Sequence, residues 1–157
     1  MLAFIQTWRE LKINKKSIKG TIEETQNLAY EISNNISGGH LILLNGEMGS
    51  GKTQFVKFLC ENLDVMNIVS SPSFLILNKY QTRKKFDIFH FDFYRLQDTR
   101  DLVEIGFFEI LESNDALVII EWADMFRELF LNKKNIIDIY FNFIKDNINL
   151  REITVTR

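Results

Sequence analysis

The sequence predicts an α/β fold with a mostly parallel central sheet and added antiparallel strands. Two short apolar runs, "HLILL" at 40–44 and "ALVII" at 116–120, are continuous rather than alternating. Such runs are typical of parallel strands that are buried on both faces. Segments with helical periodicity alternate with them, which favours a layered α/β arrangement. The stretches 73–94 and 135–157 are rich in aromatic and β-branched residues and predict antiparallel pairs.

The first predicted helix begins at Thr21, because Thr21 and Glu24 have the Thr-x-x-Glu spacing of a capping box. Apolar residues then recur at intervals of three and four, and the pair Gly38-Gly39 provides a stop. The buried strand at 40–44 follows. After a glycine-rich loop, the same helical spacing predicts a second helix over 52–63.

The second half of the chain predicts a hairpin, a helix, a buried strand and a C-terminal hairpin, in that order. The first hairpin is expected because two aromatic segments flank the polar stretch 81–85, and Asp98 is a suitable cap for the helix. The expected bounds are 73–80 and 86–94 for the first hairpin, 98–111 for the helix, 116–120 for the strand, and 135–144 and 151–157 for the last pair.

Size and composition fit a single domain. The chain has 157 residues, of which 46% are hydrophobic and 25% are charged, and this is ordinary for a globular protein with a substantial core. No repeat or linker-like tract interrupts the sequence, so we expect one domain over 1–157, with 1–20 as an N-terminal extension. In that extension Phe4, Trp8 and Leu11 recur at helical spacing. They could pack on the core or on a partner, and we expect the core.

Charge, cysteine content and hydropathy exclude several classes of protein. Nineteen basic and 21 acidic residues give a formal charge of −2, which is unlike a basic nucleic-acid binder. Cys60 is the only cysteine, so an intramolecular disulfide and a thiolate metal cluster within one chain are both excluded. No apolar run reaches the roughly 18 residues of a membrane helix, and the first residues lack a signal peptide's pattern. We therefore expect a cytoplasmic protein without membrane contact.

The loop from Gly46 to Thr53, "GEMGSGKT", matches the phosphate-binding pattern G-x-x-x-x-G-K-S/T at every fixed position. Its glycines free consecutive backbone N–H groups to surround a β-phosphate, and the helix that follows adds its positive end. Lys52 would place its charge between the β- and γ-phosphates, and the hydroxyl of Thr53 would be a ligand for Mg²⁺. The sequence therefore predicts a nucleoside triphosphate site. An ATPase, a small-molecule kinase and a GTP-dependent switch all remain open at this point.

Two carboxylates follow predicted strands. Glu121 comes directly after "LVII", and Asp92 ends "FDIFHF". Parallel strands end at the edge of the sheet where ligands bind, so both acids are expected near the phosphates, although each could simply face solvent. His90 shares the strand face of Asp92 and could either assist proton transfer or be a hydrogen-bonded structural histidine. Trp122 could stack near the nucleotide or a partner, or fill a groove.

The segment 70–74, "SSPSF", places three hydroxyls around a proline. These hydroxyls could reach Mg²⁺ or the γ-phosphate from a mobile loop, or they could form a Ser/Pro turn without a role. The basic tip 83–85 could be merely solvated or could contact RNA phosphates. Guanine recognition usually involves Asn-Lys-x-Asp, which the chain lacks, so we expect adenine rather than guanine.

The segments "GEMGSGKT", "SSPSF", "FHFDFYRL", "LVEIGFFEIL" and "VIIEW", in this order and spacing, closely resemble the TsaE family, formerly the YjeE type. The resemblance extends from about Thr21 to the C-terminus. The glycine loop is common to many proteins, but the other motifs together are highly specific. The family is the P-loop ATPase component of the bacterial machinery that forms N6-threonylcarbamoyladenosine at position 37 of tRNAs reading ANN codons. The resemblance implies a three-layer P-loop NTPase fold with a mostly parallel central sheet, antiparallel strands and a C-terminal hairpin.

The resemblance also implies contacts with the bound nucleotide. The residues that would contact ATP or ADP are Gly46, Met48, Gly49, Ser50, Gly51, Lys52, Thr53, Asp92, Glu121, Trp122, Ala123, Asp124 and Arg151. Arg151 matches a basic residue that approaches the nucleotide from the C-terminal hairpin in similar proteins. Ala123 departs from the family, because proline often follows the Glu-Trp pair there.

Catalytic roles follow from the same resemblance. Thr53 and Glu121 would ligate Mg²⁺, while Lys52, Glu121 and Asp92 would be catalytic, with Asp92 the acid needed for hydrolysis. Ser71 and Ser73 would belong to a switch-like loop. Ser73 stands where the family more often has threonine, which keeps the hydroxyl and loses the methyl group.

In that family the ATPase does not transfer the threonylcarbamoyl group. It binds a heterodimer of the transferase subunit and a paralogous scaffold subunit, of the TsaD and TsaB types, which activate its slow hydrolysis of ATP. ATP in turn resets the complex. We therefore expect ATP or ADP and Mg²⁺ as ligands, this heterodimer as the partner, and only indirect contact with tRNA.

Two other functions are open. A small-molecule kinase of the P-loop class usually covers the nucleotide with an arginine-bearing lid, whereas arginines here are few and scattered. A non-enzymatic, nucleotide-gated binding module would work without hydrolysis. Replacing Asp92 or Glu121 by its amide would leave such a module functional.

Overall fold

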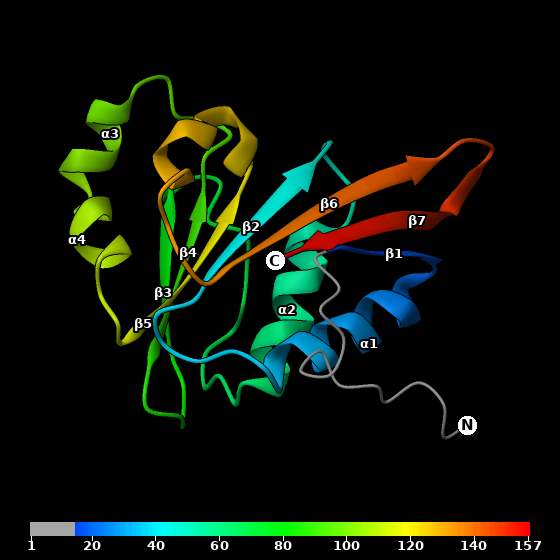
Figure 1. Cartoon of the computed structure of the whole chain (residues 1–157), viewed down its shortest axis with the longest axis horizontal. Helices are drawn as coiled ribbons and strands as arrows, with labels where there is room; N and C mark the ends of the chain where they lie inside the picture. The colour runs from blue at the N-terminus through cyan, green and yellow to red at the C-terminus, as the bar shows by residue number, and fades with distance from the viewer. Residues whose placement is uncertain (1–14) are drawn as a thin grey trace.

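The computed structural model describes residues 15–157, which form one seven-stranded sheet in the order β1-β7-β6-β2-β5-β4-β3 (Figure 1). The four central strands β6, β2, β5 and β4 are parallel, whereas β3 at one edge and β7 and β1 at the other are antiparallel to their neighbours. The predicted α/β class with a mostly parallel sheet is thus confirmed. The strands are β1 (Lys15–Gly20), β2 (Leu41–Gly46), β3 (Leu77–Gln81), β4 (Asp87–Asp92), β5 (Ala116–Glu121), β6 (Ile136–Ile144) and β7 (Asn147–Thr156).

Helices cover both faces of the sheet and make three layers. On one face lie α1 (Ile22–Ser33) and α2 (Lys52–Asn62); on the other lie α3 (Thr99–Glu104), α4 (Phe107–Leu111) and the 3₁₀ segment η1 (Ala123–Phe130) (Figure 1). One hydrophobic core lies between the sheet and α1 and α2, and a second lies between the sheet and α3, α4 and η1. Successive side chains of β2 and β5 point alternately into these two cores, and every residue of β5 is buried. This burial on both faces is why these strands are continuous apolar runs.

The predicted capping box of α1 is present. The backbone N–H of Thr21 donates to the Glu24 carboxylate at 2.8 Å, and the backbone N–H of Glu23 donates to the Thr21 hydroxyl at 3.3 Å. These bonds satisfy donors that the first helical turn leaves without partners. The helix ends at Ser33, before the glycine pair at which the sequence predicted its end.

The main difference from the sequence analysis lies in the predicted N-terminal extension. Residues 15–20 form β1, which pairs with β7 in the antiparallel register Ile18↔Ile153. The segment "KKSIKG" has one apolar residue, so no alternating pattern marks it as a strand. Phe4, Trp8 and Leu11 lie outside the described residues.

Two predicted elements are divided or shortened by local turns. The predicted helix at 98–111 is two helices, because Gly106 between them has a left-handed φ of 70°. The first predicted strand of the hairpin begins only at Leu77, because the Ile76 N–H closes a turn onto the Pro72 carbonyl at 2.7 Å. At the C-terminal hairpin, β7 begins at Asn147, earlier than predicted.

The register of the parallel strands brings the predicted site residues to the same edge of the sheet. Leu44 of β2 is paired with Glu121 of β5, and Glu121 is paired with Asp92 of β4. The glycine loop leaves the end of β2, so the loop and both acids meet at one edge of the sheet. Within residues 15–157, no helix combines the length and apolar character that crossing a bilayer requires.

Candidate functional site

A cleft of about 400 Å³ opens at this edge. It is lined by Met48, Gly49, Gly51, Lys52, Thr53, Gln54, Ser71, Ser73, Asp92, Tyr94, Glu121 and Trp122. All but Gln54 and Tyr94 are site residues that the sequence analysis named. The strand ends, the glycine loop and the segment 70–74 therefore come together around one space.

Five of the residues that the family resemblance assigns to the nucleotide do not line the cleft. They are Gly46, Ser50, Ala123, Asp124 and Arg151. Ser50 and Ala123 are buried, at 1% and 0% exposed. Whether these five contact a nucleotide stays a prediction, as do the chemical roles of the residues that line the cleft.

Lys52 is folded back onto its own loop. Its ammonium donates to the carbonyls of Gly46 and Glu47 at 2.7 and 2.9 Å and lies 4.1 Å from the centre of the Trp122 ring. Burial lowers the pKa of Lys52, and the carboxylate of Glu121 foremost opposes that shift. A charge held so close to the loop is placed to meet an anion that binds there.

The left-handed glycines of the loop differ in what surrounds them. At Gly46, with a φ of 137°, an added Cβ would lie 2.4 Å from the backbone oxygen of Phe141. At Gly49, with a φ of 75°, nothing lies within 4 Å of an added Cβ. Gly46 is therefore required both by its backbone conformation and by the close approach of β6.

We expect Gly46→Ala to lower the free energy of unfolding by about 3 kcal/mol, because it adds a backbone clash to the cost of a positive φ. Gly49→Ala is the matched control and should cost about 1 kcal/mol, from the backbone conformation alone. Urea denaturation of both variants measures the difference. Equal losses would show that the contact with Phe141 is unimportant.

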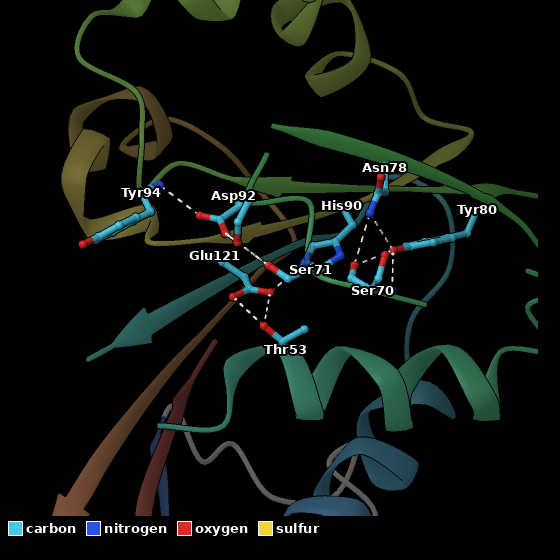
Figure 2. Close-up of polar contacts among 10 residues, drawn as sticks. Thr53, Ser70, Ser71, Asn78, Tyr80, His90, Asp92, Tyr94 and Glu121 are labelled. Atoms are coloured by element: carbon cyan, nitrogen blue, oxygen red, sulfur yellow. Dashed lines mark hydrogen bonds and ion pairs between the residues drawn. The ribbon is translucent and has the colours of Figure 1, made fainter. Parts of the chain in front are cut away.

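Thr53, Glu121 and His90 form a connected group, of which Thr53 and Glu121 line the cleft (Figure 2). The Thr53 hydroxyl lies 2.9 and 3.1 Å from the two carboxylate oxygens of Glu121, and Nε2 of His90 lies 2.9 Å from Oε1. Glu121 and His90 are 3% and 0% exposed. The buried carboxylate thus lies between a helix start and a neighbouring strand.

Asp92 connects the sheet to the segment that carries Ser71 and Ser73. Its Oδ2 accepts hydrogen bonds from Ser73 at 2.7 Å and from Ser71 at 3.4 Å, and the two hydroxyls lie 2.6 Å apart. Its Oδ1 accepts from the backbone N–H of Tyr94 at 2.9 Å (Figure 2). A change at Asp92 would therefore reach both hydroxyls of the predicted switch-like loop.

The donor set at Thr53 and Glu121 fits Mg²⁺ rather than a metal held entirely by protein. A hydroxyl and a carboxylate lie side by side at the cleft. Among residues 15–157 there is no cluster of three or more histidine, cysteine or acidic side chains arranged to hold a metal ion. Mg²⁺ usually takes one or two protein oxygens and completes its octahedron with phosphate oxygens and water. The residues present match that pattern.

Aromatic side chains form one wall of the cleft. Trp122 adopts a left-handed φ of 60°, and its backbone N–H donates to the carbonyl of Leu44 at 2.9 Å. Its ring lies 4.9 Å from that of Tyr94, measured between centres. Of the two roles that the sequence allows for Trp122, stacking and filling a groove, neither is decided by these contacts. Tyr94 was not among the predicted site residues. The only signal for Tyr94 was an aromatic two residues after Asp92.

Arg151 contacts backbone carbonyls of the glycine loop. Its Nε donates to the Ser50 carbonyl at 3.1 Å, a second nitrogen lies 3.4 Å from the Gly49 carbonyl, and the guanidinium covers the Phe143 ring. The contact with a nucleotide that the family resemblance implies for Arg151 stays a prediction.

A second buried polar group lies beside the loop and was missed. Asn45, just before Gly46, donates to Asp138 of β6 at 2.7 Å, and Asp138 forms an ion pair with Arg127 of η1. Asn45 and Asp138 are 0% and 5% exposed. The sequence feature that could have indicated this buried group is an aspartate, Asp138, inside the apolar run "NIIDIYF". These contacts connect the strand before the loop to the segment after Glu121.

Cys60 takes no part in the site. It is fully buried on α2, and burial raises the pKa of its thiol to about 12. The thiolate is the reactive form of cysteine, so this side chain is chemically inert at neutral pH.

Known proteins resemble this chain over most of its length. The model of the family described as "Threonylcarbamoyl adenosine biosynthesis protein TsaE" matches residues 20–153. The tRNA threonylcarbamoyladenosine biosynthesis protein TsaE of Rickettsia bellii is 33% identical over 147 residues, covering 90% of this chain and 96% of the relative. The protein of the same name from Aquifex aeolicus is 34% identical over 116 residues, covering 73% and 80%.

A solved structure shows the same fold. The crystal structure of YdiB from Bacillus subtilis superposes with a TM-score of 0.65 at 24% identity, covering 90% of this chain and 84% of that one. The family match spans the glycine loop, both strand-end acids and most of the C-terminal hairpin. The chain therefore belongs to the TsaE family of P-loop nucleotide-binding proteins, which is involved in tRNA threonylcarbamoyladenosine biosynthesis.

Proposed function

We propose that this protein binds ATP with Mg²⁺ and hydrolyses it to ADP and phosphate. The observation that carries the proposal is the placement of two buried acids, Asp92 and Glu121, in register on adjacent strands beside the glycine loop. A phosphate loop alone only holds a nucleotide. The acids add what hydrolysis needs: one oxygen donor beside Thr53 for Mg²⁺, and a second acid at the cleft.

The roles we assign follow from these contacts. The loop N–H groups and the ammonium of Lys52 would bind the phosphates, with the ammonium exchanging its carbonyl partners for phosphate oxygens. Thr53 and Glu121 would hold Mg²⁺, which offsets charge on the phosphates when bound. Asp92, held by Ser73 and the Tyr94 N–H, would orient the attacking water and accept its proton.

We propose further that ATP turnover serves formation of N6-threonylcarbamoyladenosine at position 37 of tRNAs reading ANN codons. The support is the family and the names of the relatives, which place them in tRNA threonylcarbamoyladenosine biosynthesis. In this proposal a cytoplasmic heterodimer of the TsaD and TsaB types carries out the transfer and activates this chain. ATP binding or hydrolysis then resets the complex, and tRNA is contacted through the partners.

The small-molecule kinase has less support. Its arginine lid would have to reach the transferred phosphate. Within the described part of the chain, the residues that line the cleft include no arginine. Arg95, close in sequence to Asp92, lies instead over the ring of Phe74.

The deciding experiment measures phosphate release from Mg–ATP by the purified chain, alone and with both partner subunits. We expect slow release alone, loss of release in EDTA, and acceleration when both subunits are present. No acceleration by the pair would remove the role in the transferase cycle. A phosphorylated metabolite as product would favour the kinase instead.

The segment 70–74 provides a prediction about Asp92. Ser73→Ala removes the 2.7 Å bond to Asp92, and a hydrogen bond to a charged group contributes enough that ATP turnover should fall by about tenfold. Ser73→Thr keeps the hydroxyl and should stay near the wild-type rate. Ser71→Ala is the comparison variant, because it removes only a long bond of 3.4 Å to Asp92 and the contact with Ser73, and it leaves the bond from Ser73 to Asp92 in place. If steady-state phosphate release falls equally in both alanine variants, Asp92 does not depend on Ser73.

A further inference from the structure

Glu121 is held by two donors that approach it from different elements (Figure 2). One is the hydroxyl of Thr53 at the start of α2, and the other is Nε2 of His90 on β4, each 2.9 Å from Oε1. A Glu121 carboxylate that binds Mg²⁺ is ionised and can only accept hydrogen bonds, so the proposed function assigns the hydrogen of this contact to Nε2 of His90. Together the two donors fix the direction in which the carboxylate points.

The two donors differ in their access to the cleft. Thr53 lines the cleft, so its hydroxyl meets whatever ligand enters. His90 does not line the cleft and is completely buried, at 0% exposed. A ligand in the cleft can therefore contact the Thr53 hydroxyl directly, whereas it cannot contact His90. Burial also excludes direct proton transfer between His90 and a bound nucleotide, which was one of the two roles open from the sequence.

His90 itself cannot turn easily. It lies opposite Ile119 in the β4–β5 register, and its ring packs at 6.2 Å, centre to centre, against Tyr80. The Tyr80 hydroxyl is in turn bonded to the Ser70 carbonyl at 2.9 Å (Figure 2). Nδ1 of His90 has no hydrogen-bond partner among residues 15–157. The bond to Glu121 is therefore the only polar contact seen for this ring in the described part of the chain.

We propose that His90 is a positioning residue, which holds the Glu121 carboxylate in the orientation that Mg²⁺ requires. The inference rests on the proposed function, because it assigns Glu121 to the metal. Partners that orient a metal-binding side chain typically affect metal affinity by about 10- to 100-fold when they are removed. A histidine that only filled the core would have no such selective effect.

The test measures binding of a fluorescent ADP analogue in EDTA and across a Mg²⁺ titration. For His90→Leu we expect ADP affinity in EDTA within about twofold of wild type, while the half-saturating Mg²⁺ concentration rises by about tenfold or more. His90→Gln retains an N–H donor at a similar distance from the backbone and should recover most of the Mg²⁺ response. Leu117→Ala is the stability control, because Leu117 is buried on the same strand as Glu121, toward the other end of β5.

The outcomes separate this inference from the proposed function. If wild-type protein shows no Mg²⁺ effect on ADP binding, the proposed metal role fails and this inference fails with it. If wild type responds and His90→Leu responds equally, only this inference is overturned. It is also overturned if His90→Leu weakens ADP binding as much in EDTA as in Mg²⁺, or if Leu117→Ala shifts the Mg²⁺ dependence to the same extent.

Discussion

Lys52→Ala is expected to reduce ATP turnover by about 10²- to 10³-fold, because it removes a preorganised charge from the site. Within residues 15–157, Lys52 is the one basic side chain that lines the cleft. Its ammonium already lies on the loop carbonyls of Gly46 and Glu47, so little rearrangement separates it from a bound phosphate. Single-turnover phosphate release measures the effect.

Lys57→Ala is the matched control for this change. Lys57 lies on the same helix and carries the same charge, but it does not line the cleft. We expect turnover by this variant to stay within about twofold of wild type, because Lys57 is a partly buried charge away from the cleft. A Lys52→Ala variant that hydrolyses ATP at the wild-type rate would be incompatible with the proposed site.

Asp92→Asn is expected to lower turnover by about a hundredfold while ADP affinity changes by less than about threefold. The amide keeps the size of the side chain and loses its charge and its capacity to accept a proton. Asp92 is only 4% exposed and is held by Ser73 and Tyr94, so the asparagine should occupy the same place. Parallel measurements of the turnover rate and of the ADP dissociation constant test this separation.

Asp87→Asn provides the comparison within the same strand. Asp87 begins β4 and forms a partly exposed ion pair with Lys79 at 2.8 Å, away from the cleft. Its loss should leave turnover unchanged. If Asp92→Asn instead weakens ADP binding as strongly as it slows hydrolysis, then Asp92 acts in binding and the non-enzymatic module regains support.

Much of the fold was predictable because it depends on strong local signals. The runs at 40–44 and 116–120 are apolar on both faces, and Thr21 with Glu24 forms a complete cap. The acids Asp92 and Glu121 were predictable for a related reason. Each directly follows apolar strand residues, and parallel strands bring such positions to one edge.

What the sequence did not predict depends on contacts between distant segments. β1 carries mostly polar residues and is held by pairing with β7, which no local pattern reports. The break at Gly106 requires a positive φ that a glycine permits but does not impose. The role of His90 could not be decided either, because the contact with Glu121 joins residues 31 positions apart.

The in-register pairing of Asp92 with Glu121 limits how the length of this chain can change during evolution. Side chains alternate along β4, with Ile88 in the core beneath α1 and α2 and Phe91 in the opposite core. One inserted residue before Asp92 would exchange the two faces and move the carboxylate away from Ser73. We therefore expect single substitutions in β4 to be tolerated more readily than insertions or deletions there. Changes of length are expected mainly in the turns, such as the polar tip at 83–85.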